Sequence, residues 1–244
     1  MIEVQDLAKH FGAVKAVDGV SFSAPDGEIT GLLGPNGAGK TTTLRMLYTL
    51  MTSDRGRVLV DGIDAARDPD AVRRRLGVLP DARGLYKRLS ARENIEYFGR
   101  LHGIDAATLR NRTDALIAAL EMADIAARKT EGFSQGQRVN TAIARALVHD
   151  PKNLILDEPT NGLDVMATRA MRRFLKQQRD EGRCVLFSSH IMQEVAALCD
   201  RIVVIARGRV VADGSAEALR AQTGEANLED AFVKIIGTEE GLAA

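Results

Sequence analysis

Short apolar runs alternate with amphipathic stretches along this chain. Runs typical of strands occur at residues 2–7, 28–33, 58–60, 76–80, 154–156, 185–188, 202–206 and 210–212. Between the second and third runs, apolar residues recur at the spacing of a helix with one buried face, at Leu44, Leu47, Tyr48 and Met51. Residues 165–179 predict another helix. Strands that alternate with helices favour an α/β fold, a largely parallel sheet covered by helices.

A long helical block interrupts this alternation. Residues 91–128 are rich in alanine and leucine, and we expect them to be almost entirely helical. With 244 residues the chain can form one large domain or two closely joined lobes around a substantial core. The block therefore predicts a helical lobe beside the sheet.

A glycine-rich loop follows the strand-like run at 28–33. It reads Gly34-Pro35-Asn36-Gly37-Ala38-Gly39-Lys40-Thr41, continues into Thr42 and opens the predicted helix. Glycines allow positive φ and close backbone approach, so that successive N–H groups can surround a phosphate at a helix N-terminus. Lys40 is expected to reach the β- and γ-phosphates, and the Thr41 hydroxyl to ligate Mg²⁺. This context favours a nucleotide-binding loop over a chance glycine-rich turn.

Two carboxylates emerge at the end of a buried strand. Asp157 and Glu158 follow the apolar residues 154–156, at the carboxyl end where parallel sheets bind ligands. Beside a phosphate-binding loop, we expect Asp157 to hold Mg²⁺ directly or through water, and Glu158 to polarise an attacking water as general base. A capping Asp-Glu pair is the alternative.

The segment Phe133-Ser134-Gln135-Gly136-Gln137 points to a family. With Arg138 and the alanine-rich stretch to Val148, it resembles the signature motif of ATP-binding-cassette (ABC) ATPases, whose usual form is Leu-Ser-Gly-Gly-Gln. The apolar run ending in Asp157-Glu158-Pro159, the turn Asn161-Gly162-Leu163-Asp164 and a histidine after a strand are similar to further motifs of this family. Their order and spacing extend the resemblance over nearly the whole chain.

The resemblance implies a fold and two cofactors, ATP and Mg²⁺. The fold is a P-loop NTPase (RecA-like) parallel-sheet core with an N-terminal antiparallel β subdomain and an inserted α-helical subdomain at about 84–150. The cassette is expected to span residues 1–238, with a tail at 239–244. Two such cassettes sandwich two ATP molecules, each bound by one subunit's P-loop and the other's signature. Ser134 and Gly136, with Gln137 in the same motif, are expected to face the partner's ATP; a helix N-cap is the alternative role of Ser134.

Three further residues receive roles from the resemblance. Phe11 matches the aromatic residue that stacks on adenine, with a core aromatic at a strand end as the alternative. Asp164 matches the turn that couples the two ATP sites across the dimer. His190 matches the switch histidine that contacts the γ-phosphate and helps to position water. Together with Lys40 and Glu158, His190 completes the expected catalytic set.

Two positions depart from the family pattern. Gln135 replaces the first glycine of the signature and Phe133 its leucine, but Ser134 and Gly136 remain, so binding of the partner's ATP should survive. After residues 78–80 the family has a glutamine that touches Mg²⁺ and the attacking water, whereas this chain has Asp81. A carboxylate is a stronger magnesium ligand than an amide, but it is shorter by one methylene and adds negative charge. Asp81 is expected at the metal, directly or through a water.

Composition limits the partners. The 33 basic and 33 acidic residues cancel, which argues against nucleic acid as a partner. Cys184 and Cys199 are too few for a disulfide framework and are expected to be buried reduced thiols. No apolar run approaches the roughly 20 residues of a membrane helix, and the N-terminus lacks a signal-peptide pattern. We therefore expect a cytoplasmic protein that contacts the membrane only through a partner, and the resemblance to ABC ATPases implies a peripheral position on the inner face of the cell membrane.

Residues 80–94 and 228–232 narrow the resemblance to the ATPases of type-2 ABC exporters, particularly the sodium-efflux group. In that family the loop at 80–94 and the helical lobe receive a transmembrane permease subunit, which implies a transporter subunit working with a second nucleotide-binding domain, a copy of itself or a related chain. ABC proteins of ribosomes or DNA carry a second cassette or a long coiled coil, which are lacking here. A P-loop kinase or GTPase leaves the signature unexplained, and a regulatory ATPase without transport is a weaker alternative.

Overall fold

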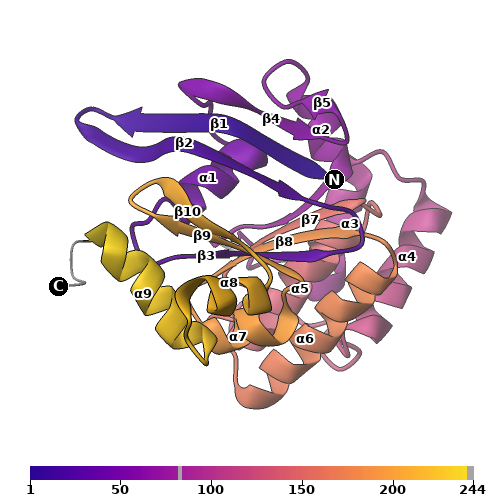
Figure 1. Cartoon of the computed structure of the whole chain (residues 1–244). Helices are drawn as coiled ribbons and strands as arrows, with labels where there is room; N and C mark the ends of the chain where they lie inside the picture. The colour runs from indigo at the N-terminus through magenta and orange to yellow at the C-terminus, as the bar shows by residue number, and fades with distance from the viewer. Residues whose placement is uncertain (82–83, 241–244) are drawn as a thin grey trace.

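Two sheets form the frame of the molecule. The computed structural model describes residues 1–81 and 84–240 (Figure 1). The core sheet has the strand order β10-β9-β3-β8-β7-β6. Its parallel strands are β3 (Ile29–Leu33), β6 (Leu76–Leu79), β7 (Asn153–Asp157), β8 (Cys184–Ser189) and β9 (Arg201–Ala206), and β10 (Arg209–Gly214) is antiparallel to β9. The second sheet is antiparallel, in the order β2 (Val14–Ala24), β1 (Ile2–Phe11), β4 (Arg55–Val60) and β5 (Ile63–Asp64).

Buried side chains alternate between the two faces of the core sheet. In β8, Leu186 packs toward the antiparallel sheet, whereas Val185 and Phe187 pack toward the helices on the opposite face. Helix α1 (Lys40–Leu47) belongs to the first of these layers, where Leu44 is fully buried. A strand that is buried on both faces has apolar residues at consecutive positions, and these continuous runs are the reason why the strands of the core sheet could be predicted from the sequence.

Helices cover the face of the core sheet that lies away from the antiparallel sheet (Figure 1). Helices α3 (Ala91–Leu101), α4 (Ala106–Ala119) and α5 (Gln135–Leu147) lie in the chain between β6 and β7, after α2 (Pro69–Arg75). The later helices are α6 (Val165–Asp180), α7 (Met192–Leu198), α8 (Ala216–Thr223) and α9 (Leu228–Glu240). This arrangement confirms the predicted α/β class with a parallel core, an antiparallel β part and inserted helices.

The predicted helical block at 91–128 is broken in two places. Gly103 has φ +75°, and the side chain of Asp105 accepts hydrogen bonds from the N–H groups of Ala107 and Thr108, which starts α4 afresh. Glu121 has φ +53° just beyond the end of α4. A glycine in the left-handed conformation followed by a capping aspartate is a helix boundary, which the alanine-rich composition concealed.

Strand β2 was missed by the sequence prediction. Lys15, Asp18 and Gly19 interrupt its apolar alternation, and its pairing with β1 shifts register where Gly19 takes φ +85°. The Asp18 N–H donates to the Gly208 carbonyl at 2.8 Å, so the strand is also attached to the β9–β10 turn. This contact holds the antiparallel sheet close to the glycine-rich loop.

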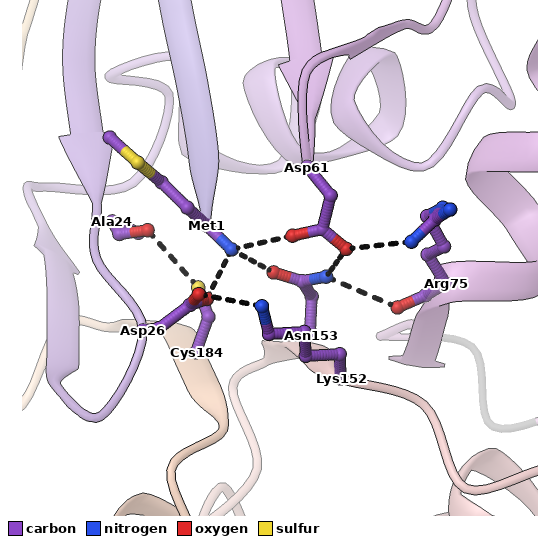
Figure 2. Close-up of polar contacts among 8 residues, drawn as sticks. All are labelled: Met1, Ala24, Asp26, Asp61, Arg75, Lys152, Asn153 and Cys184. Atoms are coloured by element: carbon purple, nitrogen blue, oxygen red, sulfur yellow. Dashed lines mark hydrogen bonds and ion pairs between the residues drawn. The ribbon is translucent and has the colours of Figure 1, made fainter.

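A polar cluster joins the two sheets at the start of the chain (Figure 2). The Met1 amino group donates to Asp61 at 2.8 Å, to Asn153 at 2.7 Å and also to Asp26. Asn153 begins β7 and donates in turn to Asp61 at 3.1 Å, while Lys152 pairs with Asp26 at 2.9 Å. The cluster connects the first strand of the antiparallel sheet to the strand that carries Asp157.

Two further expectations concern thiols and membrane helices. Cys184 and Cys199 are both free, Cys184 is buried and Cys199 is half-buried. Burial raises the pKa of the Cys184 thiol to about 12 and also raises that of Cys199. The prediction of free thiols is confirmed, and that of burial is confirmed for Cys184 only. Within residues 1–81 and 84–240, no helix is long and apolar enough to cross a bilayer.

Candidate functional site

The glycine-rich loop at residues 34–39 packs against two strands. A Cβ built on Gly34 would lie 2.3 Å from the Ile205 carbonyl oxygen, and one on Gly39 would lie 2.4 Å from the Ala16 carbonyl oxygen. Gly39 also has φ +105° and is the N-cap of α1, without a side chain to accept from the first N–H groups. Only glycine fits these two positions, and the helix start is left open to an anionic ligand.

Lys40 folds back over this loop. The residue is 7% exposed, and its ammonium group donates to the carbonyl oxygens of Gly34 at 2.7 Å and Pro35 at 3.2 Å. Burial lowers the pKa of Lys40, and the negative charges of Glu158 and Asp157 partly oppose that shift. The lysine is thus a buried cation held by backbone oxygens at the position where phosphates are expected.

A cleft of about 500 Å³ opens above the loop. It is lined by Ala16, Asn36, Gly37, Gly39, Lys40, Thr41, Thr42, Asp81, Glu158, Asn161 and His190. One space is therefore surrounded by residues of the expected phosphate-binding loop, by Asp81, by the expected general base Glu158 and by the expected switch histidine His190. Gly34, Pro35 and Ala38 belong to the loop itself and support its backbone.

Glu158 and His190 meet across this cleft. Both carboxylate oxygens of Glu158 lie 3.0 Å from Nδ1 of His190. The Glu158 side chain is 14% exposed and that of His190 43% exposed. Glu158 has φ +49°, a left-handed conformation that is uncommon for a residue with a side chain. A carboxylate held beside an imidazole at the rim of a polar cleft is suited to accept a proton from water.

The residues predicted to hold magnesium offer only oxygen ligands. Thr41 and Asp81 line the cleft, and Asp157, which is 1% exposed, immediately precedes Glu158. Hydroxyl and carboxylate oxygens are the ligands that Mg²⁺ prefers. In the part of the chain that the structure describes, no group of three or more His, Cys, Asp or Glu residues could enclose a metal. This donor set fits an ion held by one or two protein ligands together with substrate phosphates.

The signature residues lie outside the cleft. Ser134 is the N-cap of α5: its hydroxyl accepts from the Gln137 N–H at 3.3 Å, while the Gln137 side-chain oxygen accepts from the Ser134 N–H at 3.1 Å. The capping alternative is therefore observed, but this cap uses the hydroxyl only as an acceptor, and its hydrogen can still be donated to a ligand. Ser134, Gly136 and Gln137 do not line the cleft that contains Lys40.

The signature packs against the turn that ends at Asp164. A Cβ on Gly162 would lie 3.2 Å from Gln135 Cγ, and one on Gly136 would lie 3.8 Å from Leu163 Cδ2. Asp164 caps α6 by accepting from the Ala167 N–H at 2.8 Å and is likewise not part of the cleft lining. Gln135, the departure from the family pattern, therefore contacts this turn.

Phe11 ends β1 and belongs neither to the lining of the cleft nor to the contact between the signature and the Asp164 turn. Its side chain is 50% exposed, so it is not a core aromatic, and Lys9 Nζ lies 5.9 Å from the ring centre. An exposed aromatic face next to a cation is available to a planar ligand.

Sequence reasoning missed several residues of the site. Ala16 and Asn161 line the cleft. Ser188 donates to Asp157 and accepts from the Glu158 backbone. The signal for Ser188 was present, because two serines end an otherwise apolar buried strand just before His190. No pattern in the sequence pointed to Ala16, since it contributes backbone and β2 itself was missed.

Residues 17–161 match the family model described as ABC transporter. The chain is 44% identical over 224 residues to the ABC transporter ATP-binding protein NatA of Bacillus subtilis, covering 90% of this chain and 91% of that protein. It is 40% identical over 223 residues to the daunorubicin resistance ATP-binding protein DrrA3 of Streptomyces coeruleorubidus, covering 91% and 71% of the two.

Solved structures agree in fold. An ATP-binding subunit of an ABC transporter superposes with a TM-score of 0.89 at 30% identity, over 96% of this chain and 99% of that one. A dimeric bacterial ABC transporter cassette superposes with a TM-score of 0.80 at 26% identity, over 88% and 98%.

Proposed function

The chain belongs to the ABC transporter family and is one of its ATPases, and from this premise we propose that it is the ATP-hydrolysing subunit of an exporter whose membrane-spanning part is a separate chain. The observation that carries the proposal is the single cleft that joins Lys40 and the glycine-rich loop to Glu158 and His190. Export is supported by relatives such as the daunorubicin resistance protein DrrA3 and by the likeness of residues 80–94 to exporter ATPases.

The residues of the cleft, together with Phe11, have separate roles in ATP binding and hydrolysis. The backbone N–H groups of residues 36–39 in the glycine-rich loop and Lys40 bind the β- and γ-phosphates, and Phe11 stacks on the adenine. Glu158 accepts a proton from the water that attacks the γ-phosphorus, the bond to the ADP oxygen breaks, and ADP and phosphate result. His190 holds the Glu158 carboxylate in place through Nδ1. Thr41, Asp157 and Asp81 would hold Mg²⁺, directly or through water, and the ion would neutralise phosphate charge in the bound nucleotide.

A second cassette completes each site. Ser134 and Gly136 lie outside the cleft of their own chain and are exposed or half-buried at the start of α5, where hydrogen-bond donors meet a helix N-terminus. We assign them to the ATP of a second copy of this chain or of a related chain. Asp164 lies two residues beyond Gly162, against which Gln135 packs, and would couple the two ATP sites of the dimer.

An exposed apolar surface suits the membrane partner. Tyr86 is 48% exposed, and Tyr97 and Leu101, one helical turn apart on α3, are 39% and 65% exposed. The Tyr86 and Tyr97 rings contact each other at 5.3 Å between centres, edge to face. Exposed aromatic and aliphatic side chains gathered in this way are typical of a protein interface. Docking there would place the chain on the inner face of the membrane through its partner.

The test is co-purification with the membrane protein encoded beside this chain. Wild-type protein should form a stable complex whose ATPase activity responds to the transported compound in vesicles. Leu101→Glu should weaken the complex at least about tenfold, because it places a charge in an apolar contact, while hydrolysis by the isolated chain stays unchanged. Val233→Glu on α9, where Val233 is 63% exposed, is the matched control and should bind normally. Equal binding by Leu101→Glu would refute this surface, and absence of any complex would refute the transport role.

A further inference from the structure

Ser188 is a polar residue in an apolar strand. It is fully buried in β8, between β3 and β7, and pairs in register with Asp157. Its predecessor Phe187 is also fully buried. A hydroxyl without a partner at such a position would cost about 1–3 kcal/mol, so its hydrogen bonds explain its presence.

The Ser188 hydroxyl makes two hydrogen bonds, one in each direction. It donates to Asp157 Oδ1 at 2.6 Å and accepts from the Glu158 N–H at 3.0 Å. A hydroxyl bonded to a carboxylate at this distance is a short, charge-assisted contact. One buried oxygen atom thereby fixes the side chain of the expected metal ligand and the backbone of the expected general base.

The second of these bonds coincides with an unusual backbone conformation. Glu158 has φ +49°, which costs a residue with a Cβ about 1 kcal/mol or more. Its N–H points to Ser188, and its carboxylate points to His190 Nδ1, two residues further along the same segment. Ser188 and His190 therefore hold the two ends of Glu158 from one stretch of chain.

A neighbouring contact reinforces this connection. Thr160 and Glu194 are each 4% exposed, and the Thr160 hydroxyl donates to the Glu194 carboxylate. Glu194 lies in α7, which follows His190. The end of β7 and the loop after it are thus attached to the end of β8 at Ser188 and to the segment after β8 at His190 and Glu194.

We infer that Ser188 is a positioning residue, which sets the orientation of Asp157 and the backbone of Glu158 and so aims the Glu158 carboxylate at the attacking water. The inference rests on the proposed role of Glu158. Ser188 does not line the cleft and acts only through its two neighbours. Its loss should therefore impair the chemical step far more than the binding of ATP.

The test separates turnover from binding in Ser188→Ala. Its kcat should fall about 10- to 100-fold, because a displacement of about 1 Å of a catalytic group has that effect, while the ATP dissociation constant stays close to wild type. Ser188→Thr, which keeps the hydroxyl, should recover most of the activity. If the added methyl group of threonine prevents folding, Ser188→Cys replaces it as the conservative variant. Thr30→Val is the matched control: Thr30 is fully buried in the adjacent strand β3, and its hydroxyl has no partner among the described residues.

The outcomes distinguish this inference from the proposed function. Unchanged kcat in Ser188→Ala, or equal losses of kcat and ATP affinity that track a lower unfolding midpoint, would show that Ser188 is merely structural. If Ser188→Ala stays active while Glu158→Gln is inactive, the inference fails and the general base stands. If Glu158→Gln itself retains activity, the proposed chemistry fails first.

Discussion

At the scale of single residues, the candidate site contains a buried charged side chain and a residue with an unusual backbone conformation. Lys40 is a buried cation bonded to backbone carbonyls, and burial lowers its pKa. A phosphate that replaced the Gly34 and Pro35 oxygens would give this cation a stronger partner. Glu158 takes a left-handed backbone conformation beside His190. Strained residues of this kind are expected at functional sites, where the surrounding structure holds them in place.

Replacing Glu158, the proposed general base, tests the account at the scale of one residue. Glu158→Gln should lower kcat at least about 100-fold, because an amide cannot take the proton from water, while the affinity for ATP is retained. The measurement is phosphate release together with nucleotide titration. Glu121→Gln is the matched control, since Glu121 also has positive φ, at +53°, but lies outside the cleft. Turnover near the wild-type rate in Glu158→Gln would remove Glu158 from the mechanism.

The sequence predicted these residues because phosphate binding and hydrolysis need fixed residue types at fixed spacing. Lys40, Asp157, Glu158 and His190 could all be named from local motifs. The two serines that end an apolar strand marked Ser188 as unusual, but its partners depend on the register between β7 and β8, which no local pattern contains. The Gln135 contact with Gly162 was missed for the same reason, since it joins two segments that the sequence treats separately.

At the scale of elements, the helical insertion is attached to the core by a pair of stacked histidines. His102 follows α3 and His149 follows α5, and their rings stack at 3.7 Å between centres and 3° between planes. His149 Nε2 lies 3.0 Å from the Leu76 carbonyl oxygen at the start of β6, which calls for a proton on that nitrogen. The sequence prediction of one helical block gave no reason to expect this contact, because it depends on the break between α3 and α4.

This pair makes stability depend on pH. Burial, with the nearby His102, lowers the pKa of His149 to about 4, below its ordinary value of 6.5. As pH falls, His149 is therefore protonated at a higher pH in the unfolded chain than in the folded protein. The contribution of neutral His149 to stability is complete above pH 6.5, and the free energy of unfolding should decline by about 1–3 kcal/mol as pH falls toward 4. Urea unfolding at pH 7.5 and 5 should show a smaller decline in His149→Gln than in wild type. His10→Gln, at a side chain that is 41% exposed, is the control. Identical declines in wild type and His149→Gln would contradict this account.

At the scale of the whole molecule, the residues proposed to bind ATP lie in two separate places. The cleft holds the glycine-rich loop, Glu158 and His190, whereas the starts of α5 and α6 carry Ser134 and Asp164 outside it. The order of motifs along the chain indicated this division through a family resemblance. The geometry supports the proposal, because Ser134 is not part of the space that Lys40 lines, and we therefore assign it to an ATP held by another cassette.

The most direct test of this division is the mass of Glu158→Gln in solution with and without Mg²⁺ and ATP, measured by sedimentation. The account predicts that saturating ATP doubles the mass, since bound but unhydrolysed nucleotide holds two cassettes together, and that Ser134→Arg in the same background prevents the doubling. The account would be contradicted if the Glu158→Gln protein bound ATP but remained a monomer, and if Ser134→Arg in the otherwise wild-type chain left hydrolysis unchanged.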